Sequence, residues 1–142
     1  MTFIHARGPV EYDTGIPSSA FSKGDLLQYD SASSLSRWNV LLTAGTLAGV
    51  ALADSLESLG NQVPYAIARP ETIWISTATT GSQFTPGEKL DVEYTGAVFR
   101  VSTSANTPAV VVAAGGNSTD MIGSDSSRVL VSFDPDATVW RS

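Results

Sequence analysis

The sequence contains no cysteine, a single histidine and two lysines, and only 15% of its 142 residues are charged. Without cysteine, a disulfide scaffold, a cysteine-ligated zinc site and a thiol nucleophile are all excluded. The few charges are unbalanced, because eight Lys and Arg residues face 14 Asp and Glu residues and leave a formal net charge of −6. This field repels phosphate backbones and anionic lipids, so we expect neither nucleic acid nor a membrane as a partner.

Long apolar runs are also missing. The longest weakly polar stretch, residues 40–53, is shorter than the roughly 20 residues that a membrane-spanning helix requires. Residues 1–7 lack the basic start and apolar centre of a secretory signal peptide. We therefore expect the protein to be made and used in a cytoplasm.

What the sequence does contain is a series of short apolar stretches separated by Gly, Pro, Asp and Ser. Residues 72–76 alternate in period 2, and residues 90–94 and 97–102 flank a Thr-Gly turn that favours a hairpin. Residues 63–68, 110–114 and 128–133 are further expected strands. Seven to nine such strands predict a single all-β domain, a small barrel or sandwich, with at most one or two helical turns, at residues 55–59 and 76–83.

The first 22 residues are predicted to form an extended arm ahead of the domain at residues 23–142. Gly8, Pro9, Gly15 and Pro17 interrupt every helical or sustained strand period in this segment. A merely solvated tail has little use for large apolar side chains, so the arm is expected to dock on a partner. The expected partner-binding residues are Phe3, Ile4, Val10 and Tyr12.

Candidate catalytic groups are few. His5 lies in the arm, where no rigid frame would hold it against a substrate. A serine–lysine pair would need Lys23 or Lys89, and each lies in a Gly-containing turn where burial is not expected. We therefore predict that the protein is not an enzyme and has no catalytic residue.

Acidic and polar clusters are interpreted as surface. Two acidic groups, Asp134 with Asp136 and Glu88 with Asp91 and Glu93, could flank a glycosidic bond, but each is expected to be solvated. The loop at residues 117–125 has oxygen ligands without the spacing of a calcium loop. No phosphate-binding glycine motif occurs either. The sequence therefore predicts no metal and no cofactor.

Aromatic residues support a competing interpretation. Three tryptophans and four tyrosines could form a sugar-stacking platform on a sheet, as in a carbohydrate-binding or host-adhesion module of a head fibre or tail tip. The alternative is that they fill the core or an interface between subunits. A monomer that binds polysaccharide would favour the sugar-binding interpretation.

Four stretches carry a resemblance to a known family through their order along the chain. They are residues 21–29 (FSKGDLLQY), 49–55 (GVALADS), 63–68 (VPYAIA) and 84–92 (FTPGEKLDV). In this order they resemble the small capsid decoration, or cement, proteins of tailed phages, a group loosely related to the lambda head decoration protein. The resemblance covers residues 20–101 and is looser in the last third of the chain.

The resemblance implies a β-barrel or β-tulip domain that forms homotrimers on the exterior of an expanded phage capsid. The implied partners are the major capsid protein and further copies of the chain, with the N-terminal arm contacting neighbouring shell subunits. By matching position, the residues that would shape the turns of the domain are Gly24, Asp25, Gly49, Asp54 and Gly87.

Overall fold

Short β-strands make up most of the computed structural model, which describes residues 3–30, 34–38, 46–55, 61–77, 84–95, 98–102, 107–113 and 128–137. The only helical element in these ranges is a 3-10 turn at Pro135–Ala137, so the predicted all-β class is confirmed. The strands of the described ranges are β1 (Ile4–Arg7), β2 (Tyr12–Pro17), β3 (Leu26–Tyr29), β4 (Ser34–Arg37), β5 (Thr46–Ala51), β6 (Val63–Ile67), β7 (Ile73–Thr77), β8 (Lys89–Leu90), β9 (Val92–Thr95), β10 (Val98–Val101), β11 (Val110–Val112) and β12 (Arg128–Phe133).

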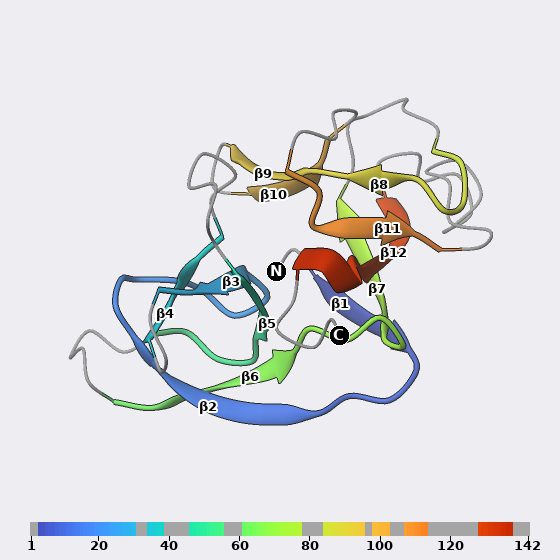
Figure 1. Cartoon of the computed structure of the whole chain (residues 1–142). Helices are drawn as coiled ribbons and strands as arrows, with labels where there is room; N and C mark the ends of the chain where they lie inside the picture. The colour runs from blue at the N-terminus through green and yellow to red at the C-terminus, as the bar shows by residue number, and fades with distance from the viewer. Residues whose placement is uncertain are drawn as a thin grey trace.

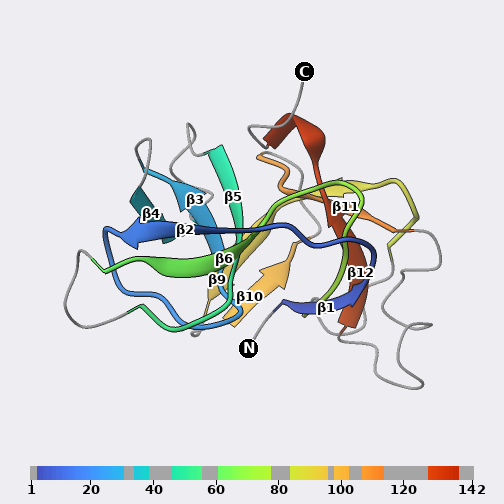
Figure 2. The same cartoon turned by 90° about the horizontal axis from the view of Figure 1, so that it is seen from below.

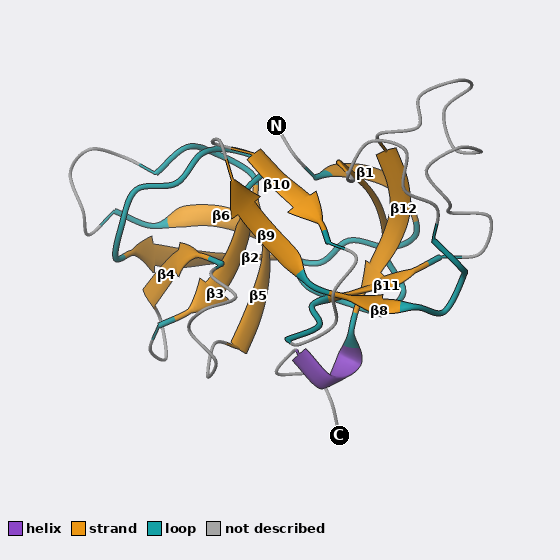
Figure 3. Cartoon of the chain, turned by 90° about the horizontal axis from the view of Figure 1, so that it is seen from above, coloured by secondary structure: helices purple, strands orange, loops and turns teal. Residues whose placement is uncertain are grey.

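Two sheets divide most of these strands between them. Strands β2, β4, β3, β5 and β6 close into a small barrel in that order (Figure 1). Strands β1, β7, β12, β11 and β8 form an antiparallel five-stranded sheet beside it. The β9–β10 hairpin lies between the barrel and the five-stranded sheet when the molecule is seen from below and from above (Figures 2 and 3).

The hydrophobic core joins the barrel to the sheet. The larger buried cluster contains Leu26 and Val50 from the barrel together with Trp74 and Val131 from the sheet. A second cluster fills the barrel itself and includes Leu35. Because the larger cluster takes side chains from both sheets, they share one apolar interior and the chain folds as one domain.

The strands expected at residues 63–68, 72–76, 110–114 and 128–133 are present, with boundaries shifted by no more than two residues. The hairpin is present too, but Thr95, expected in its turn, is the last residue of β9 and pairs with Val98. The strand expected at residues 90–94 is divided between β8, which pairs with β11, and β9, which pairs with β10. Alternation along residues 73–76 buries Trp74 and Ser76 and leaves Ile73 and Ile75 half-buried. Period-2 patterning therefore located the strand at residues 73–77 correctly.

The arm predicted for residues 1–22 is wrong for residues 3–17, which belong to the domain. Strand β1 pairs with β7, and β2 pairs with β6 along one side and with β4 along the other. Phe3 is only 1% exposed and belongs to the larger core cluster. Gly8 and Pro9 lie in the connection between β1 and β2, and Gly15 and Pro17 lie within β2. These residues therefore interrupt the sequence pattern without preventing the segment from forming two short strands.

Two of the carboxylates expected to be solvated are buried. Asp91 and Asp134 are each about 3% exposed, whereas Glu93 and Asp136 are exposed as expected. The Asp91 carboxylate accepts a hydrogen bond from the Thr107 N–H at 2.7 Å, and that of Asp134 accepts one from the Asp136 N–H at 3.0 Å. Both carboxylates thus satisfy backbone donors at chain turns, a role that alternation alone does not predict.

Some expectations lie outside the described residues. These are the helical turn after Ser55, most of the possible turn at residues 76–83, the polar loop at residues 117–125, and Trp140.

Candidate binding surface

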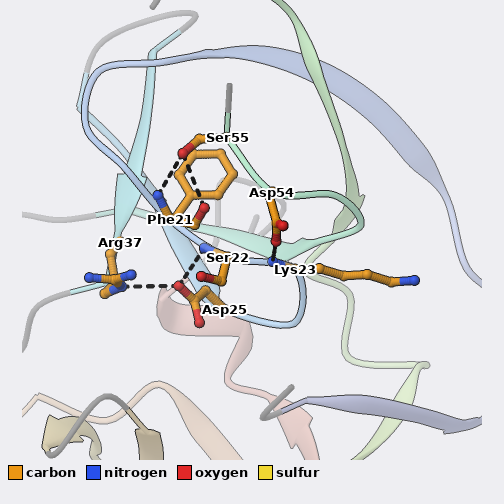
Figure 4. Close-up of polar contacts among 7 residues, drawn as sticks. All are labelled: Phe21, Ser22, Lys23, Asp25, Arg37, Asp54 and Ser55. Carbon is orange, nitrogen blue, oxygen red and sulfur yellow. Dashed lines mark hydrogen bonds and ion pairs between the residues drawn. The ribbon is translucent and has the colours of Figure 1, made fainter. Parts of the chain in front are cut away.

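The turn at residues 21–25 fixes one side of the candidate surface. The Asp25 carboxylate, 6% exposed, accepts a hydrogen bond from the Ser22 N–H at 2.9 Å and pairs with the Arg37 Nε at 3.0 Å (Figure 4). Gly24 has φ 89°, which lets the chain reverse into β3. The Lys23 side chain extends away from the turn (Figure 4). This arrangement gives Lys23 a fixed backbone and an exposed ammonium group.

The stretch after β5 holds the same turn from the other side. The Asp54 carboxylate accepts a hydrogen bond from the Lys23 N–H at 2.8 Å. The Ser55 hydroxyl accepts from the Phe21 N–H at 2.8 Å and donates to the Phe21 carbonyl at 3.0 Å. The stretches 21–29 and 49–55, separated in sequence, therefore form one hydrogen-bonded unit.

Gly49 and Gly87, the remaining predicted turn residues, differ in their surroundings. Gly49 has φ 151° and lies where Leu27 pairs with Gly49 and Gln28 pairs with Leu47, so Ala48 is an extra, bulged residue of β5. Gly87 has φ 93° and open space on the side where a Cβ would stand. Gly49 is therefore constrained by packing, whereas Gly87 is constrained by its backbone conformation alone.

An open cavity of about 200 Å³ lies where β1, the start of β2 and the 23–24 turn meet β5 and β7. All four of the predicted partner-binding residues line it. The full lining is Phe3, Ile4, His5, Val10, Tyr12, Lys23, Gly24, Val50, Ala51, Leu52 and Trp74. The cavity thus takes residues from both the barrel and the five-stranded sheet.

The four predicted residues contribute differently to this surface. Ile4 is 38% exposed and Tyr12 is 66% exposed, so their side chains are open to a partner. Val10 is partly buried against the core. The ring centroids of Phe3 and Phe99 lie 6.2 Å apart in the core. Only the part of Phe3 that lines the cavity is therefore available to a partner. Exposed Ile4 and Tyr12 are therefore the apolar groups of this surface.

The segment that carries Ile4 and Tyr12 is anchored on both sides of its connecting loop. The Thr72 hydroxyl donates to the Pro9 carbonyl, and the Ile67 N–H donates to the Glu11 carbonyl at 2.8 Å. The Arg69 guanidinium pairs with the Glu11 carboxylate at 2.6 Å. Because these contacts order the segment before any partner arrives, the surface loses little conformational entropy on binding.

The side chains with polar groups around the cavity are His5, Tyr12, Lys23 and Trp74. The His5 ring meets the Trp74 ring edge-on at 5.7 Å between centroids, and its Nε2 lies 2.9 Å from the Gly8 carbonyl oxygen. Trp74 is 3% exposed, and its indole Nε1–H has no acceptor in the described part of the chain. A buried donor without a partner is energetically unfavourable and can donate to an incoming oxygen atom.

Sequence reasoning did not find Lys23, Trp74 or the β5 residues as parts of this surface. They are distant in sequence from residues 3–12, and they reach the cavity only because the barrel packs against the five-stranded sheet. No local motif marks such a long-range juxtaposition.

Ionisable clusters elsewhere are consistent with roles in the fold. Among the described residues, no three His, Asp or Glu side chains are grouped as metal ligands would be. The Lys89 ammonium lies 3.4 Å from the Asp134 carboxylate and 3.2 Å from that of Asp136, and these two acids raise the pKa of Lys89. Burial and a 2.6 Å hydrogen bond with the Tyr29 hydroxyl raise the pKa of Tyr65.

No helix of the described chain has the length and apolarity to cross a membrane.

Comparison with models of known protein families and with curated proteins finds no match to this chain.

Proposed function

We propose that the chain is a structural virion protein, without catalytic activity, that binds the exterior of an expanded tailed-phage capsid. In this proposal it attaches as a homotrimer at three-fold and quasi-three-fold positions and stabilises the shell by clamping adjacent subunits of the major capsid protein. The observation that carries the proposal is the pre-ordered apolar surface formed by Ile4 and Tyr12 around the cavity.

The contacts between the resembling stretches support the proposal. Residues 21–29 and 49–55 hydrogen-bond to each other, and β5 pairs with β6, which contains most of the stretch at residues 63–68. The three stretches together contain β3, β6 and the second half of β5, whereas β2 and β4 of the barrel lie outside them.

The energetics of the surface fit attachment in several copies. Burial of an exposed Ile or Tyr side chain contributes roughly 1.5–3 kcal/mol, so one surface of this size binds modestly once association costs are subtracted. Three linked surfaces bind far more durably, since the second and third contacts form at high effective concentration. A trimer would therefore hold a shell that a monomer binds only briefly.

Burial of the tryptophans counts against the sugar-binding alternative. Trp38 and Trp74 are 2% and 3% exposed, and Arg37 covers the Tyr94 ring at 4.2 Å from its centroid. Within the described residues, Tyr12 is left as the widely exposed aromatic ring. One ring does not make the stacking platform that a sheet-based sugar site requires.

The test combines oligomeric state with binding to shells. Light scattering after size-exclusion chromatography should give the mass of a trimer. The purified chain should co-sediment with expanded shells assembled from the major capsid protein of the same phage, and Tyr12→Ala should weaken this binding at least tenfold. A monomer that does not pellet with such shells would overturn the proposal.

A further inference from the structure

The cavity where β1 and β7 meet β5 combines apolar walls with a lysine. Most of its lining residues are apolar, and Phe3, Tyr12 and Trp74 contribute aromatic rings. Lys23 also lines it, and the described residues of the lining include no Asp and no Glu. Small-molecule sites in proteins are concave and mostly apolar, with a few polar groups that fix the orientation of the ligand. The composition of this lining therefore indicates a ligand that is both apolar and negatively charged.

The ammonium group of Lys23 is available to such a ligand. Arg37, Arg69 and Lys89 form ion pairs with acids of the chain. Lys23 forms none within the described ranges. Its backbone N–H is held by the Asp54 carboxylate, and its side chain is exposed and extends away from the turn (Figure 4). On a chain of net charge −6, this cation is complementary to a carboxylate.

The size and the rings of the cavity suit one aromatic ring. Its volume is about 200 Å³, whereas an apolar cavity of about 150 Å³ is enough to bind benzene. Aromatic rings pack favourably in edge-to-face or offset arrangements, and His5 already meets Trp74 edge-on at 5.7 Å between centroids. The buried indole N–H of Trp74 has no acceptor in the described part of the chain, so an oxygen atom of a ligand would satisfy a donor that the protein leaves unpaired.

We propose that this cavity binds a small arylalkanoate, a molecule in which a short alkyl chain joins one aromatic ring to a carboxylate. The ring lies among the apolar side chains of the lining, and the carboxylate pairs with the Lys23 ammonium group. A free small molecule is favoured over the end of a partner chain, because both of its groups find their contacts within the one cavity. The site goes beyond the proposed function and does not depend on it.

The test uses the full chain labelled with ¹⁵N and phenylacetate as the probe. Phenylacetamide keeps the ring and removes the charge, phenethylamine keeps the ring and reverses the charge, and acetate keeps the charge without the ring. The indole resonance of Trp74, assigned by its loss in Trp74→Phe, reports on the cavity wall. The backbone amide of Lys23 reports on the charged end of the site.

We expect phenylacetate to bind saturably, with a Kd below about 1 mM, and to shift both resonances. Phenylacetamide should bind about fivefold more weakly, as expected for loss of one exposed ion pair. Phenethylamine and acetate should bind at least tenfold more weakly, because one is repelled by Lys23 and the other has no apolar surface to bury. Absence of saturable binding by phenylacetate, equal binding of phenylacetate and phenethylamine, or binding that leaves the Trp74 resonance unmoved would overturn the inference.

A matched pair of substitutions locates the charge that selects the carboxylate. Lys23→Gln should weaken phenylacetate about fivefold and change phenylacetamide less than twofold. Lys89→Gln makes the same change in net charge on β8 and should change the binding of either molecule less than twofold. Both lysines are exposed, so amide spectra check the folding of the variants. Equal effects of the two variants on phenylacetate would assign its binding to general electrostatics and overturn the site.

A blocked tetrapeptide that ends in Phe with a free carboxylate distinguishes a small ligand from the end of a partner chain. It carries the same ring and the same charge as phenylacetate. We expect it to bind no more tightly than phenylacetate, and binding at least tenfold tighter would assign the cavity to a protein C-terminus instead. Because no capsid shell enters these measurements, failure of the capsid role would leave their outcome unchanged.

Discussion

Gly49 lies so close to Ala66 that a Cβ added to the glycine would stand 1.8 Å from the Ala66 carbonyl oxygen. The contact joins neighbouring barrel strands, because Gly49 on β5 pairs with Ile67 on β6. Backbone strands can approach this closely only where one of them carries no side chain. The closure of the barrel at this point therefore depends on a glycine.

Gly49→Ala should lower the free energy of unfolding by at least about 3 kcal/mol, because it adds a backbone clash to an unfavourable φ. Urea denaturation monitored by circular dichroism measures the change. Gly87→Ala is the matched control: its φ of 93° is also unfavourable, but no atom lies within 4 Å of the new Cβ. It should be destabilised by about 1–2 kcal/mol. Equal losses for the two variants would contradict the steric explanation.

Removal of residues 1–20 should prevent folding of the domain. The deletion takes away β1 and β2, exposes the edges of β4 and β6 that β2 joins, and removes Phe3 from the core. Near-ultraviolet circular dichroism and amide dispersion measure the outcome, and a dispersed, cooperative spectrum from the truncated chain would contradict the assignment of these strands.

Single substitutions test the same point without truncation. Phe3→Ala should lower stability by about 3–5 kcal/mol, as expected for a buried aromatic side chain. Its neighbour Ile4, which is 38% exposed, should lose no more than about 1 kcal/mol on substitution with alanine. Chemical denaturation of the two variants side by side gives the comparison.

Asp25→Ala should lower stability by about 2–3 kcal/mol, because it leaves the Ser22 N–H and the half-buried Arg37 guanidinium without their acceptor. Asp54→Ala removes a single hydrogen bond to the Lys23 N–H at an exposed position and should lose about 1 kcal/mol. Thermal and urea unfolding of both variants check the order. A larger loss of stability for Asp54→Ala than for Asp25→Ala would contradict the explanation that burial of the carboxylate sets the size of the effect.

The ionisation of Asp30 should make the free energy of unfolding depend on pH in the acidic range. Burial raises its pKa, but hydrogen bonds donated by the side chains of Ser18, Ser36 and Gln28 outweigh this effect, so the pKa in the folded protein lies below 3.8. A lowered pKa means that the ionised form stabilises the fold above about pH 4, and that this stability is lost as the pH falls further. Because the carboxylate is exposed, the effect should not exceed about 1 kcal/mol.

Asp30→Asn should therefore be less stable than the unchanged protein at pH 7, and the difference should shrink by pH 2.5. Urea unfolding at the two pH values measures it. Ser36→Ala removes the hydroxyl that donates to the Asp30 carboxylate at 2.7 Å. It should therefore reduce the pH-dependent part of the free energy of unfolding. A difference between Asp30→Asn and the unchanged protein that is equal at both pH values would contradict the role of the charge.

Much of the local structure follows from the sequence because strand alternation and turn residues act over a few positions. The period of 2 along residues 72–76 and the run at residues 128–133 mark strands that the structure contains, and Gly96 marks the hairpin between β9 and β10. The short apolar stretches separated by turn residues, and the absence of long helical periods, likewise predicted the all-β class. Ile4, Val10 and Tyr12 could be selected as surface candidates because large apolar residues near glycine and proline are unusual in a merely solvated tail.

Only the tertiary structure decided which strands pair and which side chains meet. Residues 3–17 read as a loose arm, yet β6 and β7, more than 45 residues further along the chain, supply their hydrogen-bonding partners. Asp91 and Asp134 read as surface carboxylates, and burial beside backbone donors made them structural. Lys23, Trp74 and Ile4 come together at one cavity for the same reason: long-range packing of two sheets brings them there, and short-range sequence patterns carry no record of it.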